Sequence, residues 1–188
     1  MADKKLDGRI KYTRMVIRDS LFALLQEKPI GKITVTDICR GADINRATFY
    51  AHYSDPFALL QSIEQEMMED ITGRLGDAFS DECSDLFQTL TQVFGYIRDN
   101  AEACTVLLSD SSDNSFQAQV VSMLALRFIS EWASKRTISR QDAEYLYTYA
   151  AIGSVGVIRK WLLDGMDKPD EDMANLIIKL SNKGYSAF

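Results

Sequence analysis

Helix breakers are scarce in this chain, and their scarcity limits the folds that it can adopt. Pro29, Pro56 and Pro169 are the only prolines among its 188 residues. Apolar residues recur at helical spacing, and no segment shows the strict alternation of a half-buried strand. The sequence therefore predicts an all-α fold of about nine helices.

The helical stripes divide the chain into two expected domains. The polar residues 1–8 precede the first stripe and are expected to be mobile. Longer helices are expected over residues 9–27, 56–73, 83–98, 101–108, 116–135, 139–163 and 169–182. Glycine and acidic residues cluster near residues 73–84. We therefore expect a small domain at 9–55, a connecting helix at 56–73 and a second domain at 74–188.

Charge is distributed unevenly between these two parts. The whole chain carries a net charge of −6. Residues 4–53 hold ten Lys and Arg against five Asp and Glu, whereas residues 57–188 hold eleven against twenty. A positive segment on an acidic protein is typical of a single DNA-contacting surface. Such asymmetry is also common in chains that bind no nucleic acid, so the charge alone does not show whether this protein binds DNA.

The segment 33–53, ITVTDICRGADINRATFYAHY, has the pattern of two short helices joined by a turn. Thr34 and Asn45 are the expected N-caps, and Asp37 follows Thr34 by three residues, as in a capping box. The turn is expected at residues 41–43. Two helices joined by so short a turn place the second helix in the major groove of DNA. We therefore interpret residues 33–53 as a helix-turn-helix element.

Outward side chains of the helix-turn-helix element have the chemistry for reading DNA. Phe49 is expected to hold the second helix to the core, which leaves its neighbours to face outward. Arginine suits the acceptors of guanine, threonine contacts base edges, and tyrosine and histidine donate to phosphates. The residues expected to contact DNA are Thr34, Thr36, Asn45, Arg46, Ala47, Thr48, Tyr50, His52 and Tyr53. The basic residues of the first helix either contact phosphate or form a solvated face: Arg9, Lys11, Arg14 and Arg18.

No pattern in the sequence predicts an enzyme, a metal site or a membrane protein. His52 is the only histidine, and no acidic or cysteine cluster accompanies it at ligand spacing, so no metal, cofactor or catalytic triad is expected. Cys39, Cys83 and Cys104 form no C-x-x-C pair, which fits reduced thiols in a cytoplasmic protein. No apolar run approaches the ~20 residues of a membrane span. The opening residues also lack the form of a signal peptide.

The stretch ITVTDICRGADINRATFYAHYSDPFALL resembles the DNA-binding domain of the TetR/AcrR family of bacterial transcriptional regulators. The resemblance covers residues 9–72. The positions in register are Thr34, Asp37, Ile38, Ala42, Thr48, Phe49, Tyr50, His52, Leu59 and Leu60. The C-terminal half, with GYIRDN, AAIGSVGVIRKWLLDG and PDEDMANLIIKL, is similar to a variant C-terminal domain common among Firmicutes members.

The resemblance implies a homodimer that binds a palindromic operator in double-stranded DNA and represses until a small molecule releases it. The alternative is a coactivator or interaction module of the same fold that acts through a partner protein. Two departures from the family pattern bear on affinity. Asp43 replaces the usual turn glycine, and Pro56 replaces a lysine that contacts phosphate in many members.

The second domain would then hold the dimer interface and the effector pocket. Small residues in the middle of the 139–163 helix favour close approach of another helix, from the same subunit or from a second one. The expected interface residues are Ala150, Gly153, Ser154, Val157, Trp161, Leu176 and Leu180. The resemblance implies a pocket for a small apolar or aromatic effector, with plain core packing as the alternative. Its candidate lining is Met67, Phe94, Leu107, Phe116, Phe128, Trp132 and Tyr147.

Overall fold

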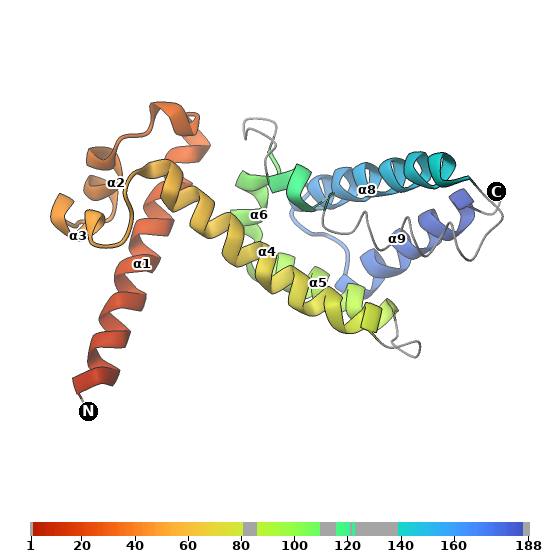
Figure 1. The fold of residues 1–188 in the computed structure, drawn as a ribbon, viewed down its shortest axis with the longest axis horizontal. Coiled ribbons are helices and arrows are strands. Elements are labelled where there is room, and N and C mark those ends of the chain that lie inside the picture. The colour runs from red at the N-terminus through yellow and green to blue at the C-terminus, as the bar shows by residue number, and fades with distance from the viewer. Residues whose placement is uncertain (1, 81–85, 110–115, 121, 123–138, 186–188) are drawn as a thin grey trace. The chain divides into compact units, whose positions relative to one another are not determined.

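The computed structural model describes residues 2–80, 86–109, 116–120, 122 and 139–185, and these residues form helices joined by short connections (Figure 1). No strand occurs within these ranges, and the predicted all-α fold is confirmed. The helices are α1 (Ala2–Glu27), the 3-10 turn η1 (Ile30–Lys32), α2 (Val35–Gly41), α3 (Arg46–Tyr50), α4 (Pro56–Ser80), α5 (Leu86–Asp99), α6 (Ala101–Leu107), α8 (Arg140–Leu163) and α9 (Asp170–Tyr185). Among the described helices, none is both long and apolar enough to cross a membrane.

Two expected helix ends are wrong, because α1 begins before its apolar stripe and α4 continues through the glycine that was expected to end it. Helix α1 begins at Ala2 rather than at residue 9, and the chain continues as helix through Gly8. Helix α4 likewise continues through Gly73 to Ser80. A glycine inside a helix costs about 1 kcal/mol relative to alanine, which a helix of some 25 residues tolerates when no proline follows. Of the helix expected at 116–135, residues 116–120 and 122 are helical and the rest lie outside the described residues.

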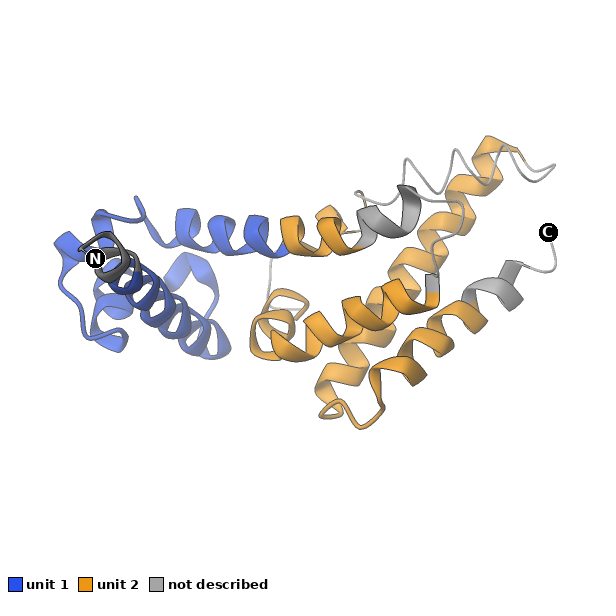
Figure 2. Cartoon of the chain, turned by 90° about the horizontal axis from the view of Figure 1, so that it is seen from below, with its two compact units in different colours: residues 1–67 blue, residues 68–188 orange. Residues whose placement is uncertain are grey.

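The chain divides into two compact units, residues 1–67 and residues 68–188, with the division inside α4 (Figure 2). In the first unit, α1 packs on α2, and α2 packs on α3. Ile17, Leu21, Ile38 and Phe49 are fully buried and form the centre of its core. In the second unit, α5 lies along α9, and α6 packs on α8.

The crossing of α1 and α2 is close enough to require glycine at position 41. The Ser20 Oγ on α1 donates a hydrogen bond of 2.9 Å to the Ile38 carbonyl oxygen of α2. A Cβ atom at Gly41 would collide with the Ser20 hydroxyl. This contact places α2 directly against α1 and so sets the position of the helix-turn-helix element within its unit.

Alanine at Gly41 should therefore destabilise the protein, while alanine at Gly73 should stabilise it. Gly41→Ala displaces Ser20 and breaks its buried hydrogen bond, for an expected loss of about 1–2 kcal/mol. Gly73→Ala places a methyl group in open space on α4 and should add about 0.5–1 kcal/mol. Urea unfolding followed by far-UV circular dichroism measures both changes. Equal shifts of the two variants in one direction would contradict the close crossing of α1 and α2.

Within the second unit, Arg98 at the end of α5 joins this helix to the connection between α8 and α9. Its Nε donates to Asp170 Oδ1 at 2.8 Å, and its Nη2 donates to the Lys168 carbonyl oxygen at 2.8 Å. The guanidinium also lies over the Trp161 ring, 5.0 Å from the ring centre. The Trp161 Nε1 donates to the same Lys168 oxygen at 3.1 Å. With a further bond from Nη1 to the Met166 carbonyl oxygen at 3.4 Å, one arginine anchors the α8–α9 connection through contacts with four residues that lie far from it in sequence.

The end of α8 has the backbone geometry that this anchoring requires. The helix stops at Leu163, where the helix expected over residues 139–163 also ends. Gly165 and Met166 take φ values of 80° and 58°, and the Met166 amide donates to the Trp161 carbonyl oxygen at 2.8 Å. Left-handed residues after a helix satisfy its last carbonyl groups in this way. The chain consequently turns sharply back toward α9.

Candidate nucleic-acid interface

Both short helices of the helix-turn-helix element begin at side-chain caps, as predicted. The Asp37 amide donates to the Thr34 Oγ1 at 3.2 Å, and the Thr34 amide donates to Asp37 Oδ2 at 3.2 Å. These two bonds complete a capping box at the start of α2. At α3, the Thr48 amide donates to Asn45 Oδ1 at 2.8 Å. Caps matter here because helices of seven and five residues are too short to form alone.

Asp37 also links the start of α2 to the end of α1, a contact that the sequence pattern did not predict. The Lys28 Nζ donates to Asp37 Oδ2 at 2.9 Å, and Arg40 lies 3.7 Å from the other carboxylate oxygen. The hydrogen bonds from Lys28 and from Thr34 lower the pKa of Asp37 to about 2, from an ordinary value of 3.8. The folded protein therefore favours the charged carboxylate.

This link predicts how stability depends on pH. Because the pKa of Asp37 is lower in the folded chain than in the unfolded chain, its contribution is fully present above pH 4 or so and is lost as the pH falls toward 2. Asp37→Asn should therefore flatten the decline of the unfolding midpoint across this range, relative to the wild type. Lys28→Gln should flatten it partly. Thermal unfolding at a series of pH values measures the effect, and identical declines for the wild type and Asp37→Asn would contradict it.

The turn of the helix-turn-helix element survives the replacement of its usual glycine. Asp43 adopts a φ of 51°, in the left-handed region that glycine favours and that aspartate tolerates better than most residues. The Ile44 amide closes the turn on the Cys39 carbonyl oxygen at 3.0 Å. Aspartate thus takes the conformation that the usual glycine would take in this turn.

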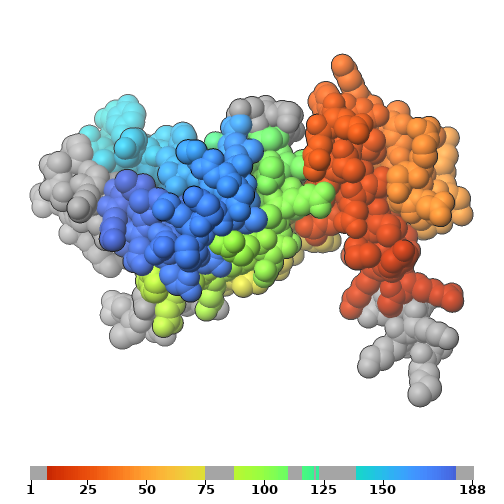
Figure 3. Space-filling model, turned by 180° about the vertical axis from the view of Figure 1, so that it is seen from behind, coloured from red at the N-terminus to blue at the C-terminus, as the bar shows by residue number. Residues whose placement is uncertain are grey.

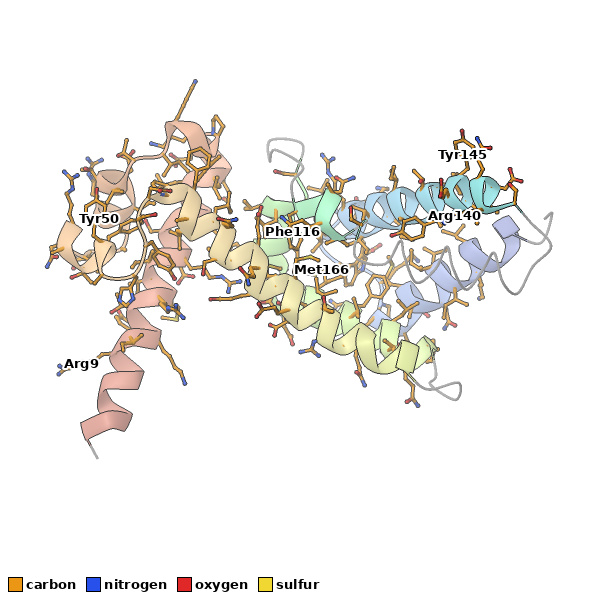
Figure 4. The ribbon with its side chains drawn as sticks, viewed as in Figure 1. Arg9, Tyr50, Phe116, Arg140, Tyr145 and Met166 are labelled. Carbon is orange, nitrogen blue, oxygen red and sulfur yellow. The ribbon has the colours of Figure 1, made fainter. Side chains whose placement is uncertain are left out.

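Helix α3 presents Arg46 and Tyr50 from a fixed base. Phe49 is fully buried, as predicted. The rings of Phe49 and Tyr50 make an edge-to-face contact, with ring centres 5.8 Å apart. Tyr50 is 49% exposed, and Figure 4 labels its place among the side chains of the helix-turn-helix element. The Arg46 Nη2 donates to the Tyr50 hydroxyl at 3.2 Å, and this bond raises the pKa of Arg46. A permanently charged guanidinium therefore stands at the start of the helix.

The other predicted contact residues differ in how much of each side chain is accessible. Those that are exposed, besides Arg46 and Tyr50, are Thr34, Thr36, Asn45 and Ala47. Thr48, His52 and Tyr53 are half-buried. The Thr48 hydroxyl donates to Asn45 Oδ1 at 3.1 Å, which leaves its methyl group and lone pairs for a partner. Tyr53 packs against Phe49, with ring centres 6.0 Å apart, and burial raises the pKa of its hydroxyl.

The four basic residues expected on α1 occupy different environments. Arg9 and Lys11 are exposed near the start of the described side chains. Arg14 approaches Glu66 of α4 at 4.0 Å, and Arg18 lies over the Phe22 ring at 5.2 Å. The Arg14 contact connects α1 with α4. The Arg18 contact is made within α1, with the buried Phe22. Helix α1 thus combines packing with a positively charged surface.

The start of α4 carries an acidic cap where many TetR/AcrR members have a cation. The Ala58 amide donates to Asp55 Oδ1 at 2.9 Å, and the Ser54 hydroxyl donates to Asp55 Oδ2 at 3.0 Å. These bonds lower the pKa of Asp55, with the backbone bond as the main cause. Pro56 follows at the first helical position and is buried. A phosphate contact at this point of the chain would need a different donor from the usual lysine.

Among the described residues, no three histidine, cysteine or acidic side chains lie close enough together to hold a metal ion. Cys39 and Cys104 are buried free thiols, and burial raises the pKa of Cys39. His52 lies beside Tyr53, with ring centres 6.2 Å apart.

In the second unit, the predicted interface residues lie on α8 and α9, and they differ in how exposed they are. Gly153 is exposed, and a Cβ atom there would meet nothing within 4 Å. Leu180 of α9 is 53% exposed. Half-buried positions are Ala150, Ser154, Val157 and Leu176. Trp161 is different, because it is only 3% exposed and its ring packs nearly perpendicular to that of Phe94, with ring centres 5.4 Å apart. It belongs to the protomer core rather than to a surface that a second copy could cover.

The exposed side of α8 carries large apolar side chains that are absent from the predicted interface. Tyr145, Tyr149, Ile152 and Leu163 are 68%, 75%, 51% and 65% exposed. Their helical spacing with the small residues was the signal that would have found them. Helices α8 and α9, in blue, lie next to each other in the space-filling view (Figure 3).

The candidate pocket residues in the described part of the second unit lie in its core. Phe94, Leu107 and Phe116 are at most 2% exposed, and Tyr147 is half-buried. Met67 is buried in the first unit. Phe128 and Trp132 lie outside the described residues. An effector pocket remains a prediction.

Comparison with known proteins places the chain in a family. A TetR-type family model described as "Transcriptional regulator C-terminal region" matches residues 84–183. A helix-turn-helix-type transcriptional regulator of Bacillus subtilis, YxbF, which is itself uncharacterised, is 33% identical over 64 residues. That match covers 34% of this chain and 17% of the relative.

Solved structures share the fold over nearly the whole chain. A TetR transcriptional regulator from Streptococcus agalactiae is 24% identical, with a TM-score of 0.63 over 96% of this chain and 99% of that one. The regulator FadR from Bacillus halodurans is 14% identical, with a TM-score of 0.66 over 93% and 96%. FadR from Bacillus subtilis, solved with stearoyl-CoA, gives 0.61 over 89% and 96% at 14% identity. Because the family model matches more than half of its residues, this chain belongs to the TetR family of transcriptional regulators.

Proposed function

We propose that this regulator is a homodimer that binds a palindromic operator through the helix-turn-helix element, with Arg46 of α3 as its main base-reading residue. The observation that carries the proposal is the construction of α3. A fully buried Phe49 and an Asn45 cap fix a five-residue helix, and an exposed arginine and tyrosine project from it. Rigid presentation of a guanidinium fork suits the paired acceptors of guanine in the major groove.

Contacts to the DNA backbone would come from residues around α3. The exposed hydroxyl groups of Thr34 and Thr36 stand at the start of α2, and His52 follows α3. Donors in such places bind phosphate oxygens and fix the register of the protein on DNA without reading its sequence. The exposed cations Arg9 and Lys11 would add the salt-dependent part of the affinity.

The exposed side of α8 supports a dimer in the second unit. It combines large apolar side chains with glycines that have open space around them. Gly153 and Gly156 would let a helix of a second copy approach closely, while Tyr149 and Ile152 would be buried by it. Two-fold symmetry would place the two copies of α3 roughly 34–36 Å apart, one turn of DNA.

Release by an effector would require two states of the dimer that differ in the spacing of their α3 helices. A ligand shifts that balance only through its different affinity for the two states. FadR of Bacillus subtilis, solved with stearoyl-CoA, is a regulator of the same fold with a bound small molecule. We propose a small apolar or aromatic effector for this chain, with repression in its absence.

A second function is favoured by the start of α4. Pro56 stands where many family members place a phosphate-contacting lysine, and the neighbouring Asp55 adds a carboxylate, which lowers the expected affinity for DNA. A chain with weak DNA binding could act as a coactivator that binds a partner protein. The two functions differ in what the purified chain binds.

In vitro selection from random duplex DNA tests the proposed function. The wild type should enrich a palindrome whose half-sites lie one helical turn apart, and Arg46→Ala should lose the strongest guanine position or enrich nothing. Arg140→Ala, at the start of α8, removes an arginine that is 80% exposed, serves as the matched control and should enrich the wild-type palindrome. No enrichment by the wild type would contradict DNA reading and favour the coactivator.

A further inference from the structure

Arg46 and Tyr50 form a pair that holds the guanidinium before any DNA is bound. The two residues stand one turn apart on α3, and the Arg46 Nη2 donates to the Tyr50 hydroxyl oxygen at 3.2 Å. The guanidinium carbon also lies 5.8 Å from the centre of the Tyr50 ring. A free arginine side chain must lose considerable rotational freedom on binding. The contact with Tyr50 removes part of that loss in advance.

Tyr50 is itself held in place, so the restraint reaches back to the core. Its ring meets Phe49 at an interplanar angle of 85°, and Phe49 is fully buried. The buried Phe49 therefore positions the Tyr50 ring, and Tyr50 in turn positions the Arg46 guanidinium. An exposed pair without such a base would be worth little.

The pair leaves the guanidinium able to read a base. Guanidinium has five N–H donors, and the Tyr50 hydroxyl accepts from one of them. Both terminal nitrogens keep a donor, which is what the O6 and N7 acceptors of guanine require. The hydroxyl oxygen of Tyr50 is the acceptor in this bond, and its own proton is left to donate elsewhere. Tyr50 can thus act on DNA in two ways: through Arg46, or by a direct bond to phosphate.

We propose that Tyr50 is a positioning residue for Arg46, and that the pair reads one guanine in each half-site of the operator. This inference rests on the proposed function, because it takes α3 as the element that enters the major groove. If it holds, the contribution of Tyr50 to DNA affinity depends on the presence of Arg46 and on the identity of one base pair.

Tyr50→Phe separates the two ways in which Tyr50 can act. The substitution keeps the ring on Phe49 and removes only the hydroxyl, so the fold of α3 should be unchanged, with the same far-UV circular dichroism as the wild type. If Tyr50 acts through Arg46, affinity for the selected duplex should fall about 2- to 10-fold. The fall should disappear in the Arg46→Ala background and on a duplex whose guanine position has been changed. The dependence of affinity on salt should stay as in the wild type.

Equilibrium binding of the full-length chain to fluorescent duplexes measures these effects. The probes are the duplex enriched by the wild type and its single base-pair variants, each with wild type, Tyr50→Phe, Arg46→Ala and the double variant. An equal loss on every duplex, persisting without Arg46 and with a salt slope reduced by about 1, would overturn the inference in favour of a phosphate contact. It would leave the proposed function intact. Failure of the wild type to enrich any duplex would overturn both.

Discussion

Phe49→Ala should unfold the first unit and leave the second unit folded. The ring of Phe49 is fully buried, and its removal leaves a cavity beneath α3, for an expected loss of about 3–5 kcal/mol. A unit of 67 residues has little stability to lose, and α3, with only five residues, cannot form alone. Both tryptophans, Trp132 and Trp161, belong to the second unit. Far-UV circular dichroism should therefore lose helical signal while tryptophan fluorescence keeps its wild-type spectrum.

Phe57→Ala is the matched control for this experiment. Phe57 lies at the start of α4 and is 55% exposed, so the same change should alter stability by less than about 0.5 kcal/mol. If Phe49→Ala changed both signals together, or neither, the buried position of Phe49 within a separate unit would be contradicted.

Arg98→Ala should have the largest effect of any surface substitution in the second unit. It removes hydrogen bonds to Asp170 and Lys168 and uncovers the face of Trp161. The Arg98 side chain is 37% exposed, so solvent screening reduces the value of its ion pair, and we expect a loss of about 2 kcal/mol. The unfolding transition followed by tryptophan fluorescence should move to lower urea concentration, and the emission of the folded protein should change because Trp161 becomes more accessible.

Two variants test whether this effect comes from the geometry of Arg98 or from its charge. Arg98→Lys keeps the charge but lacks the planar fork, and it should lose most of the same stability. Arg140→Ala removes an arginine paired with Glu144 at 3.3 Å, with the arginine 80% exposed, and should change stability by less than about 0.5 kcal/mol. Equal effects of Arg98→Ala and Arg140→Ala would show that the contacts of Arg98 add nothing to the stability of the fold.

Local features of the fold were predictable because they depend on residues that are neighbours in sequence. Thr34 and Asn45 cap their helices through bonds to residues three positions ahead, and Ser139 caps α8 in the same way, with the Asp142 amide donating to its hydroxyl at 3.0 Å. The left-handed turn at Asp43 likewise follows from the short connection between two helices. These are the features that identify the helix-turn-helix element.

Contacts between distant residues were not predictable from spacing. Ser20 and Gly41 stand 21 positions apart, and their close approach depends on how α1 crosses α2. Arg98 reaches Asp170 across 72 positions. Trp161 was assigned to a dimer surface because its helix carries small residues, but it lies on the inner side of that helix, against Phe94. A stripe of apolar or small residues along a helix shows that one side of the helix is buried. It does not show which element covers that side.

Binding to DNA as a function of salt tests the central proposal most directly. The duplex enriched by the wild-type chain and a scrambled duplex of the same composition would be titrated at increasing salt. A dimer that contacts about six phosphates should lose affinity about a thousandfold between 50 and 200 mM salt, with a linear dependence on the logarithm of the concentration. The enriched duplex should bind more tightly than the scrambled one at every concentration. Equal affinity for both duplexes, or affinity that does not change with salt, would contradict a regulator that reads its operator through α3.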